Sequence, residues 1–307
     1  MKLKLRLSLL CLPLSSLLLC PITSALAQAP DKVSTTKRPG KKLIEVGWDQ
    51  PDTKQLRMMG KQMEETTPFD GVVYVLKFTA EGKTYDENKI LTLTPLKKEW
   101  LLKPLAEMKA CRFTKFTDNF IRVNTAPGDL KWDDDKAWAN ATANLGLVAW
   151  FAKQSGSKGI AFDPECYAEP QYQWNPKGGL TFEKAQTLAR KRGNQAIKAM
   201  SREFPSLTFL AFWLLSLNSQ NASSPDPTPS LRSEKYGLWP AFVAGLVEAA
   251  PATVKLVDAN ENGYYPDDRY GYLSLYNLMR GENSPLRNLL PDDVRAKYNR
   301  QVTAGFG

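Results

Sequence analysis

Short apolar runs alternate with longer helical patterns through most of this chain, from residue 42 to residue 307. Strands that alternate with helices form a parallel sheet with right-handed connections. Polar residues follow each apolar run, and no Gly-rich phosphate-binding turn follows the first one. That combination favours a barrel of the TIM type, (β/α)8, over an open doubly wound sheet. We therefore expect an α/β fold with the polar residues on one rim.

The individual elements follow from the period of the apolar residues. Strands are expected at 42–49, 70–77, 112–123, 158–165, 207–215, 254–262 and 300–307. Helices are expected at 53–65, 97–108 (within the stretch 89–109), 133–154, 182–204 and 239–250, with a loop at 216–233. About seven β/α units are present, so the barrel domain (42–307) is expected to be truncated before an eighth strand. A miscount of the strands is the alternative explanation.

The first 27 residues have the pattern of a signal peptide. Lys2, Lys4 and Arg6 precede an interrupted apolar run, and Ala25–Ala27 supplies a small-x-small cleavage site. Residues 28–41 are polar and are expected to form a disordered lead-in. The protein is therefore predicted to be secreted or periplasmic, with no stable membrane span after cleavage near Ala27. An uncleaved anchor is the alternative.

Charge and composition exclude several classes of protein. The formal charge of +9 falls to +6 when the three basic residues of the signal peptide are removed, and the remaining positive charge is scattered. This distribution is not typical of a nucleic-acid-binding surface. The chain contains no histidine, which removes Ser-His-Asp chemistry, the HExxH motif and His-ligated zinc. Acid–base chemistry therefore falls to carboxylates, and no cofactor or metal is expected.

Asp163 and Glu165 stand at the end of the fourth expected strand, after Ile160–Phe162. Residues two apart in a strand share a face, and two carboxylates on one face are costly to bury unless they are paired or used. On spacing alone, two interpretations of these carboxylates have about equal weight. Either they pair with Lys or Arg or cap the next helix, or they belong to a functional site.

Polar residues gather after other expected strands as well, and in a barrel they converge on the rim that carries the chemistry. These residues are Trp48, Asp49, Asn119, Asn124, Asp258, Asn260 and Glu261. Tyr167, Trp174 and Tyr264 add aromatic rings, which stack on the C–H faces of sugars. A carboxylate pair with aromatic neighbours is the equipment of glycoside hydrolysis.

Three segments carry a family resemblance: Lys42–Asp49, Thr67–Val73 and Gly159–Tyr167. They resemble a group of secreted bacterial proteins of planctomycete and verrucomicrobial type, which is itself similar to TIM-barrel glycoside hydrolases. The end of the third segment also resembles the fourth-strand motif of chitinases. Ile160 and Ala161 stand where that motif has earlier polar residues, so the match is partial.

The resemblance implies a carbohydrate substrate, with Glu165 as general acid/base, Asp163 orienting it, and Glu261 or Asp49 as the partner carboxylate. Trp48, Asn119, Asn124, Tyr167, Trp174, Asp258, Asn260 and Tyr264 would bind the substrate. A non-catalytic carbohydrate-binding or surface protein on the same scaffold is the first alternative. A hydrolase that uses the acidic rim to hold Mg²⁺ or Ca²⁺ is the second.

Overall fold

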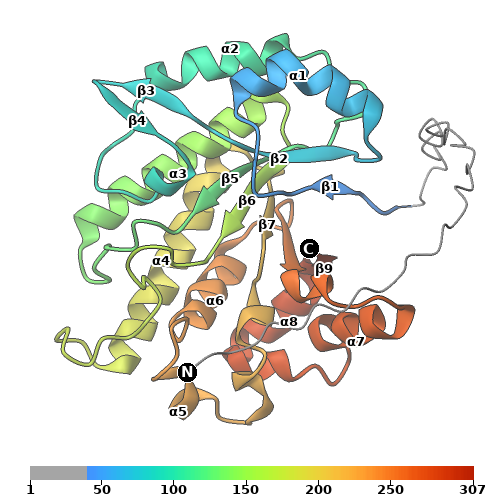
Figure 1. Cartoon of the computed structure of the whole chain (residues 1–307). Coiled ribbons are helices and arrows are strands. Elements are labelled where there is room, and N and C mark those ends of the chain that lie inside the picture. Colours follow the sequence, from blue (N-terminus) through green and yellow to red (C-terminus); the bar gives the residue numbers. More distant parts are fainter. Residues whose placement is uncertain (1–39) are drawn as a thin grey trace, which may run out of the picture. The chain divides into compact units, whose positions relative to one another are not determined.

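The computed structural model describes residues 40–307, which form an α/β fold around a curled parallel sheet (Figure 1). The expected signal peptide (1–27) and nearly all of the expected lead-in (28–41) lie outside the described residues. Both remain predictions.

The main sheet has seven strands, and its strand order follows the order of the chain. The strands are β1 (Ile44–Glu45), β2 (Gly71–Val75), β5 (Phe120–Asn124), β6 (Gly159–Asp163), β7 (Thr208–Ala211), β8 (Lys255–Asn260) and β9 (Val302–Phe306). Every neighbouring pair is parallel. Together with its helices, this half-barrel is consistent with part of a TIM-like barrel, and it confirms the expected α/β class.

Eight α-helices lie in the described part of the chain. They are α1 (Thr53–Thr66), α2 (Leu102–Ala110), α3 (Asp135–Ser155), α4 (Phe182–Glu203), α5 (Thr228–Leu231), α6 (Trp239–Ala249), α7 (Arg269–Arg280) and α8 (Asp292–Gln301). Asp52, Asp134 and Thr181 accept backbone N–H bonds at the starts of α1, α3 and α4. These caps satisfy the free donors of the first turn, and they explain why the expected helix starts were nearly correct.

The segment after β2 differs from expectation. β3 (Phe78–Ala80) and β4 (Lys83–Tyr85) form an antiparallel hairpin that the apolar pattern did not predict. The expected helix at 97–108 is confirmed, first as a short 3-10 turn from Lys98 and then as α2.

The third strand is shorter than the expected 112–123, because residues 112–119 are not part of it. The Glu64 carboxylate accepts the backbone N–H groups of Thr114, Lys115 and Phe116. A side chain that takes these donors removes them from a strand ladder. Sequence alternation alone could not reveal this competitor.

The two faces of the sheet carry separate hydrophobic clusters. The inner cluster contains Val73, Phe120, Ala161 and Phe212. The residues that alternate with them along the strands, such as Ile121 and Phe162, belong to the larger cluster beneath the helices. Since strand side chains alternate, Arg122 and Asp163 continue the inner rows toward the carboxyl ends of β5 and β6.

Helices α3, α4 and α6 lie side by side along the outer face of the sheet (Figure 1). Glycines allow the close crossing of α4 and α6. A Cβ atom at Gly193 would lie 2.0 Å from the carbonyl oxygen of Phe242, and one at Gly245 would lie 1.9 Å from that of Arg190. No side chain fits at either position without moving a helix.

Gly193→Ala should therefore lower the free energy of unfolding by about 1–3 kcal/mol, the usual range for overpacking. Gly146→Ala in α3 is the matched control, since its Cβ atom would lie 3.3 Å from its nearest neighbour, the Ala199 oxygen. Its helix-propensity gain of about 1 kcal/mol offsets a small clash. Urea unfolding compares the two variants, and equal effects would contradict the close crossing.

Candidate active site

A buried ion pair joins β5 and β6 at their carboxyl ends. Arg122 Nη2 lies 2.6 Å from Asp163 Oδ2, and the Asp163 side chain is only 1% exposed. The other carboxylate oxygen of Asp163 accepts the backbone N–H of Glu165 at 2.9 Å. The ion-pair interpretation of the carboxylates therefore holds for Asp163. It does not hold for Glu165, which has no such partner among residues 40–307.

Arg122 connects this pair to other parts of the rim. Its Nη1 donates to Gln50 Oε1 at 3.1 Å, and its guanidinium lies 5.9 Å from the centre of the Phe212 ring. Burial by itself would lower the pKa of Arg122, but the hydrogen bond and charge of Asp163 outweigh it and raise the pKa. Its Nε atom is buried and has no partner among the described residues. Arg122 is thus a fixed cation whose Nε is left without a partner in this part of the chain.

Glu165 lies in the turn after β6 and is half-buried. The Tyr167 hydroxyl donates a hydrogen bond to its carboxylate, and Asn124 Nδ2 donates to its backbone oxygen at 3.1 Å. Burial and then the bond to Glu165 raise the pKa of Tyr167, which keeps the hydroxyl protonated as a donor.

Glu261 begins a 3-10 turn, η5 (Glu261–Tyr264), directly after β8. Burial raises its pKa to about 7, and the negative charges of Glu165 and Asp163 add to the rise, while Arg122 opposes it. These charges act on Glu261 because the ends of β6 and β8 open to the same rim. Glu261 therefore holds a proton near neutral pH beside a second carboxylate.

Two other predicted residues lie after β1 and line a shallow cavity of about 280 Å³. Trp48 is 96% exposed and Asp49 is exposed beside it. The complete lining is Trp48, Asp49, Gln50, Asp52, Gln55, Val75, Lys77, Asp86, Glu87 and Arg122. Arg122 is common to this cavity and the ion pair, so the cavity adjoins the carboxylates of β6.

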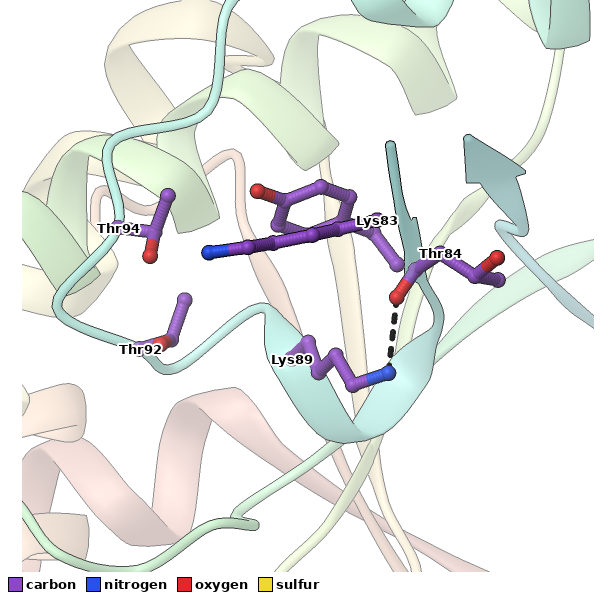
Figure 2. Close-up of a pocket in the computed structure, with 6 residues that line it drawn as sticks. Lys83, Thr84, Lys89, Thr92 and Thr94 are labelled. Carbon is purple, nitrogen blue, oxygen red and sulfur yellow. Dashed lines mark hydrogen bonds between the residues drawn. The ribbon is translucent and has the colours of Figure 1, made fainter. Parts of the chain in front are cut away.

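A second cavity of about 330 Å³ lies between the β3–β4 hairpin and the loop that follows it. In Figure 2 the Lys83 side chain extends across this cavity toward Thr92 and Thr94, and Lys89 donates to the Thr84 oxygen at 2.8 Å. None of the predicted site residues lines it.

Two predicted polar residues hold the fold together and do not face the site. Asn119 lies before β5, at the opposite end of the sheet from the rim, where its side chain bonds Val72 N and Phe116 O. Its placement was wrong because the third strand begins later than expected. Asp258 is fully buried and accepts from Leu214 N and from Ser216. Burial raises its pKa, and these hydrogen bonds oppose the rise.

Asn260 and Asn124 are also structural. Asn260 is buried and its Oδ1 accepts the Asn262 N–H at 3.0 Å. Asn124 is buried and accepts the Ala126 N–H, besides its bonds to the β6 turn. The Trp174 indole donates to the Leu180 oxygen at 2.9 Å and packs edge-on against Phe182. Trp174 is partly buried against the core, and its contact with substrate stays a prediction.

Tyr264 remains a rim residue, 81% exposed and edge-on to Tyr265. Sequence reasoning missed Arg122 and Gln50. The signal for Arg122 was available, since a charged residue in an apolar strand two positions before Asn124 shares the inner face of the barrel. Glu45 was missed as well. Burial raises its pKa, and its Oε2 atom is buried without a partner among the described residues.

Within residues 40–307, no group of three or more Cys, Asp or Glu side chains is arranged to hold a metal ion. No helix in the same range is both long enough and apolar enough to span a membrane.

Comparison with known proteins adds no relative. No family model matches the chain, no curated protein is significantly similar to it, and no solved structure matches it.

Replacing Arg122 with methionine should leave Asp163 buried without its cation. Removal of one partner of a buried ion pair costs about 3–5 kcal/mol. Arg122→Met is therefore expected to lose that much unfolding free energy at neutral pH. The double variant Arg122→Met/Asp163→Asn should recover most of the loss, since Asn keeps the acceptor for Glu165 N–H without the charge. Chemical unfolding of both variants measures this, and a double variant no more stable than the single one would contradict the pairing.

The pKa of Glu261 makes stability depend on pH. Because this pKa rises from 4.5 to about 7 on folding, the folded state binds more protons than the unfolded state between these values. Stability then falls as pH rises through that window. Such a shift is worth at most about 3 kcal/mol, and solvent screening of a half-buried group reduces it to on the order of 1 kcal/mol.

Urea unfolding at pH values on either side of the window should show this loss in the parent protein and not in Glu261→Gln. An identical slope in the two proteins would show that Glu261 is not the titrating group.

Proposed function

We propose that this protein is a glycoside hydrolase that uses two rim carboxylates, Glu261 and Glu165, to cleave an O-glycosidic bond. The observation that carries the proposal is the pair of opposite environments. Glu261 has a pKa near 7, while Glu165 receives a hydrogen bond from Tyr167. A carboxyl group with a raised pKa that acts together with a second carboxylate is the recurring acid–base arrangement of glycosidases.

In this reaction the Glu261 carboxylic acid donates its proton to the glycosidic oxygen. The bond between that oxygen and the anomeric carbon breaks, and its electron pair stays with the departing oxygen. The Glu165 carboxylate either attacks the anomeric carbon or takes a proton from the attacking water. This assignment exchanges the roles suggested by the sequence, where Glu165 was the acid. Asp163 is paired with Arg122 and serves to position the Glu165 turn.

Aromatic side chains at the rim support a sugar substrate. Trp48 and Tyr264 are largely exposed, and Tyr265 lies edge-on to Tyr264. Exposed rings of this kind offer flat apolar surfaces for the C–H faces of pyranose rings. The parallel order of the sheet supports membership in the (β/α)8 class, whose active sites lie at the carboxyl ends of the strands. We also propose secretion, on the signal-peptide pattern of residues 1–27.

Glu261→Gln and Glu165→Gln should each reduce hydrolysis by about 10²–10⁴-fold, the contribution of a general acid or base. A panel of aryl glycosides and oligosaccharides, with reducing ends measured, provides the assay. Glu203→Gln is the matched control, because Glu203 ends α4 at the amino-end side of the sheet and is exposed. Full activity in either rim variant would refute the assignment.

Activity of the parent protein should fall as pH rises above about 7, since Glu261 then loses the proton that it must donate. Aryl glycosides with good leaving groups need less protonation and should show a weaker fall.

A non-catalytic carbohydrate-binding protein is the second candidate, favoured by the exposed Trp48 beside a cavity. Saccharide binding without any turnover across the panel would establish that candidate in place of the hydrolase.

A further inference from the structure

The cavity beside Trp48 has a charge balance that bears on which saccharide it accepts. Four carboxylates line it, from Asp49, Asp52, Asp86 and Glu87, against the two cations Lys77 and Arg122. Its lining is therefore more negative than positive, although the chain as a whole carries a formal charge of +9. The net positive charge of the chain would not lead one to expect a cavity lined mainly by carboxylates.

One of the two cations of this lining is already paired with a carboxylate outside it. Arg122 is neutralised by Asp163, with 2.6 Å between Nη2 and Oδ2. Lys77 is exposed at the end of β2. A uronic acid in this cavity would therefore meet a net negative field, with Lys77 and the remaining N–H donors of Arg122 to oppose it.

Two of the carboxylates are already occupied. Asp52 accepts the Gln55 N–H at the start of α1. Asp86 accepts the Asn88 N–H and lies 3.8 Å from Lys89. Asp49 and Glu87 pair with no lysine or arginine in the part of the chain that the structure describes. Glu87 Oε1 accepts a hydrogen bond from Asn88 Nδ2 at 3.3 Å, which leaves its Oε2 and the Asp49 carboxylate to meet a ligand.

Trp48 gives the second, independent indication of a ligand. Its indole ring is 96% exposed, so both of its flat apolar faces are open to the C–H face of a sugar ring. Trp48 stands on the same wall as Asp49, so a ring stacked on the indole would present its substituents to the carboxylates. Indole faces also attract ammonium groups directly.

We infer that this cavity is a subsite for a sugar unit that carries a free amine, a protonated 2-amino-2-deoxyhexose. Trp48 stacks on the ring, and Asp49 and Glu87 receive the ammonium group. The unit lies next to the carboxylates of β6 through Arg122, which both regions share. The inference rests on the proposed function for the class of ligand, and its test uses binding in place of turnover.

The test compares three oligosaccharides of equal length by titration calorimetry: a glucosamine oligomer, a neutral glucose oligomer and a galacturonate oligomer. The full mature chain carries Glu261→Gln, which prevents turnover. Mildly acidic buffer keeps the sugar amines protonated and the aspartates and glutamates ionised. The glucosamine oligomer should bind about tenfold or more tightly than the neutral one, a difference of about 1.4 kcal/mol. The galacturonate oligomer should bind weakest.

Variants then locate the preference. Asp49→Asn combined with Glu87→Gln should bring the glucosamine and neutral oligomers to equal affinity, whereas Glu203→Gln should leave the difference unchanged. Trp48→Ala should weaken both oligomers by a similar factor. Added salt should reduce the preference in the parent and not in the double variant.

The outcomes separate this inference from the hydrolase proposal. Equal affinities in the parent, or a preference that survives the double variant, overturn the subsite even where hydrolysis of other glycosides is found. A preference that behaves as described upholds the subsite even where no glycoside is hydrolysed.

Discussion

The ion pair between Arg122 and Asp163 is the interaction on which the rim depends. It links neighbouring strands where the inner apolar cluster ends and polar chemistry begins. Through Asp163 Oδ1 it fixes the backbone of Glu165, and through Gln50 it reaches the loop after β1. A buried charge pair is worth little to net stability compared with apolar packing. Its value here is positional, because one guanidinium sets the places of three rim segments.

The pair also shows that the carboxyl groups at this rim have different partners. Arg122 forms an ion pair with Asp163, and the Tyr167 hydroxyl donates a hydrogen bond to Glu165. For Glu261, burial and the negative charges of Glu165 and Asp163 raise the pKa. Arg122 opposes this rise only in part. The chemistry of each carboxyl group is therefore set by its contacts, which sequence spacing does not contain.

The sequence predicted what depends on periodicity. Seven apolar runs gave the seven parallel strands, and capped helical patterns such as 133–154 gave helices close to their true bounds. The predictions failed where one side chain competes with the backbone. Glu64 captures the donors that would have extended the third strand, which displaced Asn119 to the other end of the sheet. Asp258 was polar at a plausible position, but its partners lie in another segment. Arg122 lies in the middle of β5, whereas the predicted site residues were those near or after the ends of the strands.

The order of strands in the main sheet is the order of the chain, from β1 to β9 without a swap. Each strand of the main sheet pairs with the strand of the same sheet that precedes it in the chain. Contacts between adjacent units span short stretches of chain, which shortens the loops that must close before a contact forms. The sheet is thus able to grow unit by unit from its first strand, in the direction of synthesis. The last strand to join, β9, waits for no distant partner before it pairs with β8.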